Sequence, residues 1–410
     1  MRDCEVLVVG AGITGLTIAR ELTSRGAEVL ILEKEDEVGR HASGRNSGVL
    51  HSGVYYSPDT LKARFCVQGN RMMKEYCREK GLTLLETGKV VVARNQEEAA
   101  LLSELQRRAE AAGARARLID LQELSQIEPQ ASTWGRALFC PETAVVRPRE
   151  ILRSLERELS TSGKARICYR TRVEGFRTPT EALTSGGTVR FRYLVNAAGA
   201  FADRLAHSLG LGREFRLLPF KGAYWKLSPA RSGLVRGNIY PVPDLRYPFL
   251  GLHFTRSADG EVYLGPSIAP AFGRENYRGL EGMGPEALAI AARLAVLFLA
   301  DPQFRSAALR ERAKLSPRRL WREAVSLLPP LRPSDLQTSS KVGIRPQLVS
   351  LSRRSLVTDF VILREGTHLH VLNAISPAFT SSLAFAAYAA DLLEGGSGEP
   401  LNSGSWKTDN

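Results

Sequence analysis

Three glycines near the start of the chain have the spacing of a dinucleotide-binding turn. Gly10, Gly12 and Gly15 form a Gly-x-Gly-x-x-Gly pattern, and Glu33 follows at the distance expected of an acid that binds a ribose hydroxyl. In such a motif the first glycine permits a tight turn, the second lets the backbone approach a pyrophosphate, and the third lets a helix pack on a strand. The alternatives are a glycine turn of an α/β domain that binds no ligand, and a solvated acid at the end of a strand. The pattern does not separate a nicotinamide dinucleotide from a flavin dinucleotide.

The elements around these residues are predicted to form a β-α-β unit. Residues 4–9 are a nearly continuous, β-branched apolar run, as expected of a parallel strand covered on both faces. Helical spacing over residues 16–22 follows the glycines and ends before Gly26, a typical residue after a helix C-terminus. A second strand over residues 28–32 leads to Glu33. The N-terminus of the helix would then stabilise the charge of a bound phosphate.

A polar, glycine-rich segment, residues 39–56, follows the second strand, where a nicotinamide domain would more simply continue into a helix. Such a loop can lay backbone amides and hydroxyls along a flavin. With this segment the chain resembles the L-2-hydroxyglutarate dehydrogenase family, within the glycine oxidase and D-amino-acid oxidase superfamily of FAD enzymes. The resemblance also rests on SPDTLKA (57–63), YPVP (240–243) with GLHFTR (251–256), GIRPQ (343–347) and NAISPAFTSSL (373–383).

The fold that we expect is α/β: a Rossmann-like FAD-binding domain with a mainly parallel sheet, and a second α+β substrate domain built on an antiparallel sheet. Residues 1–78, 145–210 and 340–395 are predicted to form the discontinuous FAD-binding domain. Residues 79–144 and 211–339 would form the substrate domain, and 396–410 a frayed tail. Helices are predicted at 97–112, 151–159, 285–298, 320–327 and 381–393, and strands at 166–173, 193–195 and 368–372.

The resemblance implies that FAD is bound non-covalently and that further residues contact it. Ser43, Asn46, Ser47 and Gly48 would line the pyrophosphate and ring, and Val173 would meet the adenine. Besides the three glycines and Glu33, the residues expected at the cofactor are Lys34, Ser43, Asn46, Ser47, Gly48, Val173, Ala198, Gly199, Ser376, Pro377, Ala378, Thr380 and Ser381. The last of these precede a helix whose N-terminus would stabilise a reduced, anionic flavin.

The resemblance further implies oxidation of L-2-hydroxyglutarate to 2-oxoglutarate, with hydride passing from C2 to flavin N5. This reaction needs a base for the hydroxyl proton, with a pKa near neutral, and histidine fits best. His253 and His51 lie within the resembling segments and are the two candidate bases. Each could instead be a hydrogen-bonded structural histidine.

A dicarboxylate substrate also needs cationic groups, and the fork of an arginine matches a carboxylate. Arg345 is the first candidate for this catalytic clamp, with Lys221, Arg256 and Tyr56 as further substrate-binding candidates. In a chain rich in arginine, a surface or interdomain ion pair is the alternative role for each.

Two positions depart from the wider superfamily. Ser376-Pro377-Ala378 replaces a glycine-rich C-terminal flavin motif, as in the hydroxyglutarate enzymes, and Ala223 stands where an acidic residue is expected after Gly222. The alternatives that stay open are therefore a glycine or D-amino-acid oxidase, a glycerol-3-phosphate-type dehydrogenase, and a non-catalytic flavin-binding scaffold.

Composition and cysteine content indicate the class of protein and its cellular location. With 43% apolar and 24% charged residues among 410, the chain is globular rather than disordered or fibrous. Its five cysteines are an odd number without a C-x-x-C pair, so we expect reduced thiols and no metal site. No apolar run is long enough for a membrane span, and the start lacks the pattern of a secretory signal, which predicts a cytoplasmic protein.

The net charge of +13 favours anionic partners. The basic run between residues 305 and 322 is predicted to be a solvated helical face or a peripheral surface for anionic lipid on the inner face of the cell membrane. Such a surface would suit electron transfer to a quinone, with oxygen as the second candidate acceptor. Nucleic acid is not expected, because no binding module or set of stacking aromatics accompanies the run. The sequence does not indicate an oligomeric state.

Overall fold

The computed structural model describes residues 2–244 and 250–395, and the chain divides into two compact units. The first unit contains Met1–Gly44, Pro148–Leu218 and the segment from Pro346 onward; the second contains Arg45–Arg147 and Pro219–Arg345. Residues 45–78 thus group with the second unit. The division into cofactor and substrate domains stays a prediction. The tail predicted to be frayed, 396–410, lies outside the described residues.

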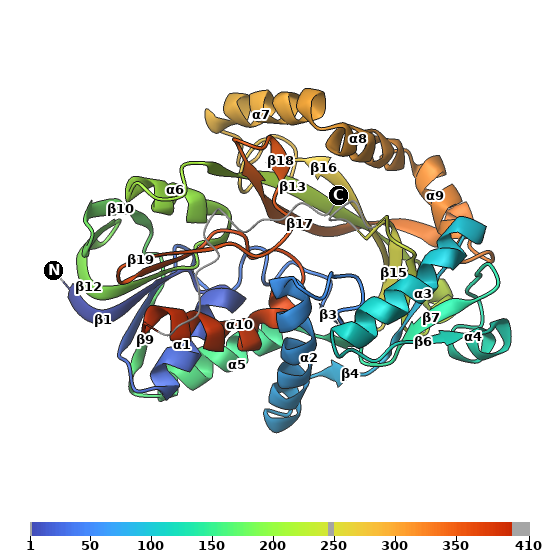
Figure 1. The fold of residues 1–410 in the computed structure, drawn as a ribbon, viewed down its shortest axis with the longest axis horizontal. Helices are drawn as coiled ribbons and strands as arrows, with labels where there is room; N and C mark the ends of the chain where they lie inside the picture. The colour runs from blue at the N-terminus through green and yellow to red at the C-terminus, as the bar shows by residue number, and fades with distance from the viewer. Residues whose placement is uncertain (1, 245–249, 396–410) are drawn as a thin grey trace. The chain divides into compact units, whose positions relative to one another are not determined.

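A mainly parallel sheet forms the centre of the first unit (Figure 1). Its parallel strands run in the order β9 (Ala165–Cys168), β2 (Val29–Leu32), β1 (Arg2–Val9), β12 (Gly187–Asn196) and β20 (His368–Val371). Three strands add antiparallel pairs: β10 (Val173–Thr178), β11 (Glu181–Thr184) and β19 (Ile362–Glu365). The predicted α/β class, with a parallel sheet at the nucleotide motif, is confirmed.

Helices cover both faces of this sheet. In Figure 1, α1 (Ile13–Ser24), α5 (Pro148–Thr161) and α10 (Ala378–Leu393) lie on one face, and α6 (Ala202–Ser208), which follows the short η1 (Gly199–Phe201), lies on the other. The apolar run of β1 is buried throughout Val6–Val9, which is why this strand can sit in the centre of the sheet. As predicted, α1 ends just before Gly26, which has a φ of +105°.

Two predicted elements of the first unit need correction. The strand predicted at 166–173 is two strands, because β9 ends at Cys168 and β10 begins only at Val173. Between them Arg170 takes a φ of +52°, a left-handed conformation that a strand cannot contain. Helix α10 begins at Ala378, three residues before the predicted start, because Pro377 can precede a helix without needing an amide hydrogen bond.

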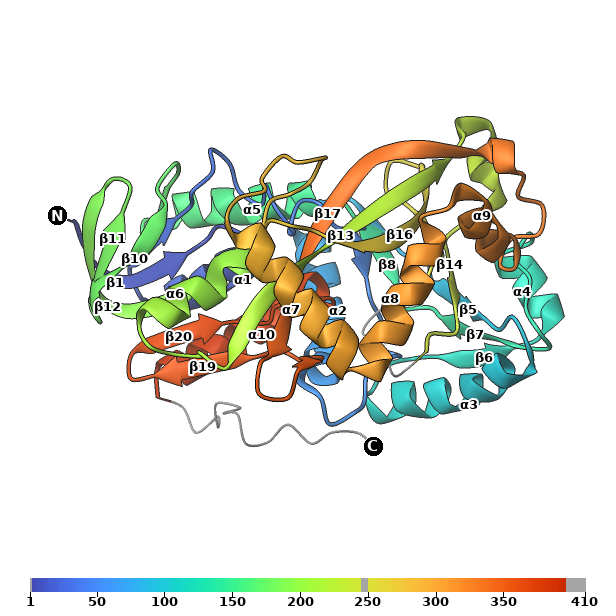
Figure 2. The ribbon, with the colours of Figure 1, turned by 90° about the horizontal axis from the view of Figure 1, so that it is seen from above.

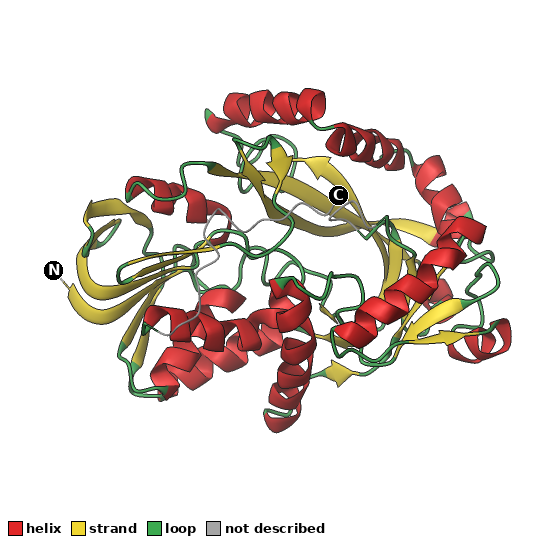
Figure 3. Ribbon diagram, in the orientation of Figure 1, coloured by secondary structure: helices red, strands yellow, loops and turns green. Residues whose placement is uncertain are grey.

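The second unit is built on a mostly antiparallel sheet (Figure 3). Its strands run in the order β17 (Leu336–Ser350), β13 (Phe215–Leu227), β16 (Val262–Pro270), β15 (His253–Arg256), β14 (Asn238–Pro241), β5 (Lys89–Val92), β7 (Ala137–Cys140) and β6 (Arg117–Ile119). Strands β13 and β17 continue into the first unit, where β18 (Ser355–Leu356) pairs with the end of β17. A separate small sheet contains β3 (Val49–Leu50), β8 (Ala144–Val146) and β4 (Leu84–Leu85).

Six α-helices of the second unit are described. They are α2 (Leu61–Glu79), α3 (Gln96–Ala111), α4 (Leu121–Ile127), α7 (Glu286–Ala300), α8 (Pro302–Lys314) and α9 (Pro317–Val325), with the short η2 (Pro229–Leu234) and η3 (Pro333–Asp335). The last three α-helices follow one another along one side of the unit (Figure 2). All five cysteines are free thiols, as predicted.

The alternation of side chains along β5 separates two cores. Val90 and Val92 pack with Phe254 on one face, whereas Val91 packs with Tyr55 and Tyr240 on the other. Because successive strand residues point to opposite faces, Lys89 shares the face of Val91. A lysine is thereby placed at the rim of a buried aromatic core.

Candidate active site

The glycine motif forms a close-packed turn between β1 and α1. Gly10 has a φ of +101°, and a Cβ atom there would lie 2.7 Å from the Ala197 carbonyl oxygen. A Cβ atom on Gly15 would lie 2.0 Å from the Gly10 carbonyl oxygen and 3.4 Å from the Val8 side chain. These two glycines therefore let the turn and the first helix pack against the sheet, as the sequence indicated.

Gly12 differs from its two neighbours in the motif, because it has room. A Cβ atom there would meet only the Ser43 hydroxyl oxygen among the described atoms, at 3.1 Å, and its φ of −79° is ordinary. The same hydroxyl accepts a hydrogen bond from the Ile13 amide at 2.9 Å. Backbone amides at the start of α1 and a hydroxyl group thus lie together, which is the chemistry that binds a phosphate. Both residues fit the roles predicted for them.

Glu33 stands directly beside this turn. Its carboxylate accepts hydrogen bonds from the amides of Ala11 at 2.8 Å and Glu35 at 3.0 Å. The side chain is 7% exposed, so the carboxylate is held in place rather than solvated. An acid fixed next to the phosphate-binding turn fits a ribose hydroxyl of the adenosine half of a dinucleotide.

Lys34 lies in a small polar cluster after β2. Its ammonium contacts the Glu35 carboxylate and lies 2.8 Å from His41 Nε2, and the same histidine nitrogen lies 2.8 Å from Glu35. Burial opposes ionisation of Glu35, but the hydrogen bonds from Lys34 and His41 outweigh it and lower its pKa to about 2. The cluster fixes the loop that carries Glu33. A direct role of Lys34 at the cofactor stays a prediction.

The other cofactor candidates of the first unit lie at the ends of strands. Val173 opens β10, and Ala198 and Gly199 follow β12, where the Ala198 amide donates to the Asn196 side chain at 3.3 Å. Ser376 and Pro377 precede α10, whose first turns bury Thr380 and Ser381 completely. Ser381 Oγ has no hydrogen-bond partner in the described part of the chain, so a buried hydroxyl is available near this helix N-terminus.

The candidates that belong to the second unit begin with the loop before β3. The Gly48 amide donates to the Asn46 side chain at 2.8 Å, and the Val49 amide lies 3.5 Å from the Ser47 hydroxyl. The loop ends in β3, directly before His51. Its hydroxyl, amide and glycine residues are of the types predicted, and their contact with the cofactor stays a prediction.

The two candidate bases lie in one cluster of buried side chains of the second unit, with Lys89, Tyr55 and Tyr240, which is called the histidine pocket below. His253 begins β15, and its imidazole stacks on the Tyr240 ring with 3.8 Å between the ring centres and 16° between the planes. His253 Nδ1 lies 2.9 Å from the Gly251 carbonyl oxygen, to which it donates, so Nε2 is the nitrogen that can accept a proton. His51 and His253 are close enough to influence each other's ionisation. The sequence segments that carry them are about two hundred residues apart.

The pKa values of both histidines differ from the near-neutral value expected from the sequence. Burial lowers the pKa of His51 to about 3, and the charges of Lys89 and His253 add to this effect. Burial likewise lowers the pKa of His253 to about 3, opposed by its hydrogen bond to Gly251 and reinforced by Lys89 and Lys314. Without a substrate, both imidazoles are therefore neutral throughout the neutral pH range and can accept a proton.

The predicted substrate-binding residues have different surroundings. Arg345, in β17, has its pKa lowered by burial to about 10, with Tyr56 opposing the shift. Lys221 Nζ donates to the Asn276 side chain at 3.3 Å, and burial lowers its pKa. Arg256 donates instead to the backbone carbonyls of Ser232 and Val235, at 3.1 and 3.0 Å. Tyr56 and Arg345 lie close enough to interact electrostatically, and the substrate-binding roles of Arg345, Tyr56 and Lys221 stay predictions, whereas the Arg256 side chain holds backbone carbonyls at residues 232 and 235.

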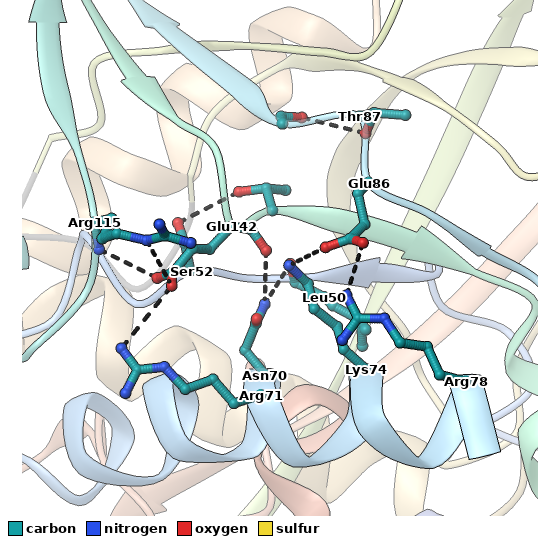
Figure 4. A network of polar contacts seen from close by, with 12 residues as sticks. Leu50, Ser52, Asn70, Arg71, Lys74, Arg78, Glu86, Thr87, Arg115 and Glu142 are labelled. Atoms are coloured by element: carbon teal, nitrogen blue, oxygen red, sulfur yellow. Dashed lines mark hydrogen bonds and ion pairs between the residues drawn. The ribbon is translucent and has the colours of Figure 1, made fainter.

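Sequence reasoning missed Asn70, which fixes the backbone around His51 (Figure 4). This residue of α2 is 2% exposed, and its amide nitrogen donates to the carbonyls of Leu50, His51 and Glu142 at 3.2, 3.0 and 3.1 Å. Around it, Glu142 pairs with Arg115 at 3.1 Å. The available signal was a polar residue at a buried helical position.

Sequence reasoning also missed Lys89, Tyr55 and Tyr240, which line the histidine pocket. Lys89 Nζ lies 4.1 Å from the centre of the Tyr55 ring and 5.1 Å from that of Tyr240. The signal in the sequence was a lysine directly before Val90-Val91-Val92, in phase with the buried Val91.

Comparisons with known proteins cover nearly the whole chain. The family described as FAD dependent oxidoreductase matches residues 5–392. The human mitochondrial L-2-hydroxyglutarate dehydrogenase is 34% identical, over 95% of this chain and 88% of that protein, and the L-2-hydroxyglutarate dehydrogenase of Escherichia coli K12 is 33% identical, over 95% and 93%.

Two solved structures show the same fold at low identity. L-α-glycerophosphate oxidase of Mycoplasma pneumoniae, described with FAD bound, has a TM-score of 0.75 at 21% identity, covering 96% of this chain and 95% of that one. Glycine oxidase of Geobacillus kaustophilus has a TM-score of 0.73 at 20% identity, covering 97% and 96%.

Proposed function

The chain belongs to the FAD dependent oxidoreductase family, and from this premise we propose that it oxidises L-2-hydroxyglutarate to 2-oxoglutarate. The relatives named for this reaction supply the substrate. The structural observation that carries the proposal is the pair of buried imidazoles, one of which stacks on the ring that Lys89 contacts. A proton acceptor among cationic groups is what the oxidation of an anionic hydroxy acid needs.

The residues of the first unit fit FAD. Gly10, Gly12 and Gly15 with the Ser43 hydroxyl would hold the pyrophosphate, and Glu33 the ribose. The buried Ser381 hydroxyl at the start of α10 would serve the flavin. When bound, FAD accepts the hydride from C2 of the substrate.

The residues of the second unit would handle the substrate. His253, through Nε2, accepts the hydroxyl proton as the bond to C2 becomes a carbonyl; His51 is the other candidate for this role. Arg345, with Tyr56 and Lys221, would bind the carboxylates, because a guanidinium fork and an ammonium group complement two negative charges. The role of a base explains why two histidines are buried here.

Anaerobic spectroscopy of the purified protein tests this function. L-2-hydroxyglutarate should bleach the flavin absorbance, and glycine, D-alanine and glycerol 3-phosphate should not. Bleaching by one of these three compounds instead would assign the protein to an amino-acid oxidase or a glycerol-3-phosphate dehydrogenase. Bleaching by none of the four would favour a non-catalytic flavin-binding scaffold.

We further propose a membrane quinone as the electron acceptor, with oxygen second, and α7 as the contact with the membrane. This helix is apolar along most of its length, yet only Ile290 and Leu297 of its residues are buried. Leu288 is 82% exposed and Leu299 76%. No single described helix is long and apolar enough to cross a bilayer, although α7 and α8, bent by 113°, reach the required length and composition together.

The charge beside α7 points to an anionic lipid surface rather than to a neutral partner. Helices α8 and α9 follow α7 along the same side of the unit (Figure 2). They carry four exposed arginines, Arg312, Arg318, Arg319 and Arg322. Exposed leucines on one helix, with exposed arginines on the two helices that follow it, are the chemistry of a segment that lies in an anionic membrane interface.

Sedimentation with vesicles tests this surface. The protein should bind phosphatidylserine-containing vesicles at low salt, bind less at high salt, and fail to bind pure phosphatidylcholine. Leu288→Ser with Leu299→Ser should weaken binding at least about tenfold, because each leucine loses the free energy of burial in the interface. Leu101→Ser, at a 40% exposed leucine of α3, is the matched control. No salt-sensitive binding by the unmodified protein would exclude the surface.

A further inference from the structure

Lys89 is a buried cation to which the reaction proposed above assigns no step. The residue is 1% exposed, and Nζ has no hydrogen-bond partner within residues 2–244 and 250–395. Burying a charged amine without a hydrogen bond is costly, so such a group is retained only where its surroundings stabilise it or its charge has a use.

The surroundings of Lys89 stabilise a cation through aromatic faces. The ammonium lies over the rings of Tyr55 and Tyr240, at 4.1 and 5.1 Å from their centres, and both rings are buried. A cation held over two desolvated π faces is favourable by an amount comparable to a hydrogen bond to a charged group. The two tyrosine rings therefore form a site that stabilises a positive charge on Lys89.

The titratable groups that face Lys89 come from every element packed around it. Cys140 lies directly opposite on β7, and Cys66 comes from α2. Burial lowers the pKa of Lys89, and these two thiols oppose the shift; no carboxylate of the described residues is among the groups that shift it. His51 and His253 complete the set, and Lys62 and Lys314 act from α2 and α8 on Cys66 and His253 respectively.

The ring of Tyr240 joins Lys89 to the candidate base. One aromatic ring interacts with the ammonium, and the same ring stacks on the His253 imidazole at 3.8 Å. The pocket thus holds three basic groups: Lys89 and His253, which contact the same Tyr240 ring, and His51, whose ionisation the charges of both influence. Since like charges repel strongly at low dielectric, such a pocket favours a single proton among its three bases.

We propose that Lys89 is a positioning residue which holds this single positive charge between Tyr55 and Tyr240, and thereby adds to the effect of burial in keeping His51 and His253 as neutral imidazoles. Its importance for catalysis rests on the proposed function, but the distribution of protons in the pocket does not. Lys89 touches no reacting atom in this proposal; it acts through the histidines.

NMR of the FAD-loaded protein tests the proposal without using the substrate. With ¹³C-labelled histidine and ¹⁵N-labelled lysine, assigned with His51→Gln, His253→Gln and Lys89→Arg, Lys89 should be an ammonium at neutral pH while both imidazoles are neutral. A neutral Lys89 amine beside a protonated His51 or His253 would overturn the proposal. This measurement on the unmodified protein requires no variant to keep the native fold.

Substitution of Lys89 then tests whether its charge affects the pKa values of the two histidines. In Lys89→Met the repulsion that disfavours imidazolium is gone, so the pKa of His51 or His253 should rise by about one unit or more. In a plot of the flavin-reduction rate with L-2-hydroxyglutarate against pH, the acid limb, where the rate falls at low pH, should move to higher pH by the same amount. Lys89→Arg keeps the charge and should keep the wild-type limb.

A second buried lysine provides the matched control. Lys74 of α2 is paired with Glu86 at 3.0 Å and does not contribute to the shift of either histidine. Lys74→Met should leave both histidine pKa values unchanged. Histidine pKa values unaltered in folded Lys89→Met would refute the coupling. If no flavin reduction is seen with L-2-hydroxyglutarate but the NMR pattern holds, the substrate assignment fails and the Lys89 proposal stands.

Discussion

A methyl group at Gly12 should separate folding from FAD binding. In Gly12→Ala the added Cβ meets only the Ser43 hydroxyl oxygen among the described atoms, at 3.1 Å, at the end of a side chain that can rotate. The φ of −79° suits alanine, so the cost to folding should be at most about 1 kcal/mol, the value of the hydrogen bond from Ile13 that Ser43 would give up. A bound pyrophosphate would meet the same methyl group at close range.

The expected loss of FAD affinity follows from that overlap. Forcing a methyl group into a close-packed contact costs about 1–3 kcal/mol, which corresponds to a dissociation constant roughly 5- to 150-fold higher. Flavin fluorescence titration of the apoprotein measures the affinity, and thermal unfolding of the same apoprotein measures stability. Wild-type affinity in Gly12→Ala would refute the placement of the pyrophosphate at this turn.

Substitutions at two other glycines provide controls for this experiment. A Cβ on Gly15 would lie 2.0 Å from the Gly10 carbonyl oxygen, which is backbone and cannot rotate away, so Gly15→Ala should lower both stability and affinity. A Cβ on Gly284 would have no atom of the described residues within 4 Å, and the φ there is not left-handed, so Gly284→Ala should change neither. If Gly12→Ala changes neither stability nor FAD affinity, as expected for Gly284→Ala, the turn does not bind the cofactor.

Three further predictions concern the base, its support and the loop after β2. His253→Gln should slow anaerobic flavin reduction by L-2-hydroxyglutarate about 100-fold or more with FAD still bound, and His51→Gln should slow it less; normal reduction in both would exclude either as the base. Asn70→Leu removes the amide donor shared by three buried carbonyls, of which that of His51 keeps the Cys66 thiol as a donor, and should lower the free energy of unfolding by about 2–4 kcal/mol; equal stability in denaturant titration would contradict this role of Asn70. Because the pKa of Glu35 is lowered to about 2 from 4.5, the ionised carboxylate stabilises the fold above pH 4.5, and this stabilisation is lost as the pH falls toward 2. Glu35→Gln should therefore be less stable than the wild type at neutral pH, and the difference should disappear between pH 4.5 and pH 2. A difference in melting temperature that does not depend on pH would refute the ion-pair account.

The sequence predicts the first unit well because its signals are local. The apolar run of β1, the three glycines and Glu33 all lie within one β-α-β segment, where spacing along the chain is spacing in the fold. The error at 166–173 arose because alternation of side chains continues across a turn that only the left-handed φ of Arg170 reveals. A backbone conformation of a non-glycine residue leaves no mark on a pattern of side-chain types.

The histidine pocket was predictable only in part, because tertiary contacts assemble it. His51 and His253 stood out through the segments that contain them, but nothing local tells that Tyr240 stacks on one of them. Lys89 reads as an ordinary strand-end lysine until β14 and β5 are paired, which brings Tyr240 alongside Val91. Arg256 shows the converse, since an arginine in a resembling segment donates to two carbonyls of its own unit.

The low histidine pKa values and the expected near-neutral base are reconciled by the charge of the substrate. An imidazole with a pKa of about 3 is a weak proton acceptor, and burial with the nearby Lys89 accounts for that value. An opposite charge within a few ångströms raises such a pKa by about 1–3 units, and a dicarboxylate brings two negative charges. The base would then become strong only when the anionic substrate is in place, while the resting pocket stays unprotonated. A pocket of basic groups poised in this way discriminates against neutral and zwitterionic substrates by charge, which favours a hydroxy dicarboxylate over glycine as the compound that reduces the flavin.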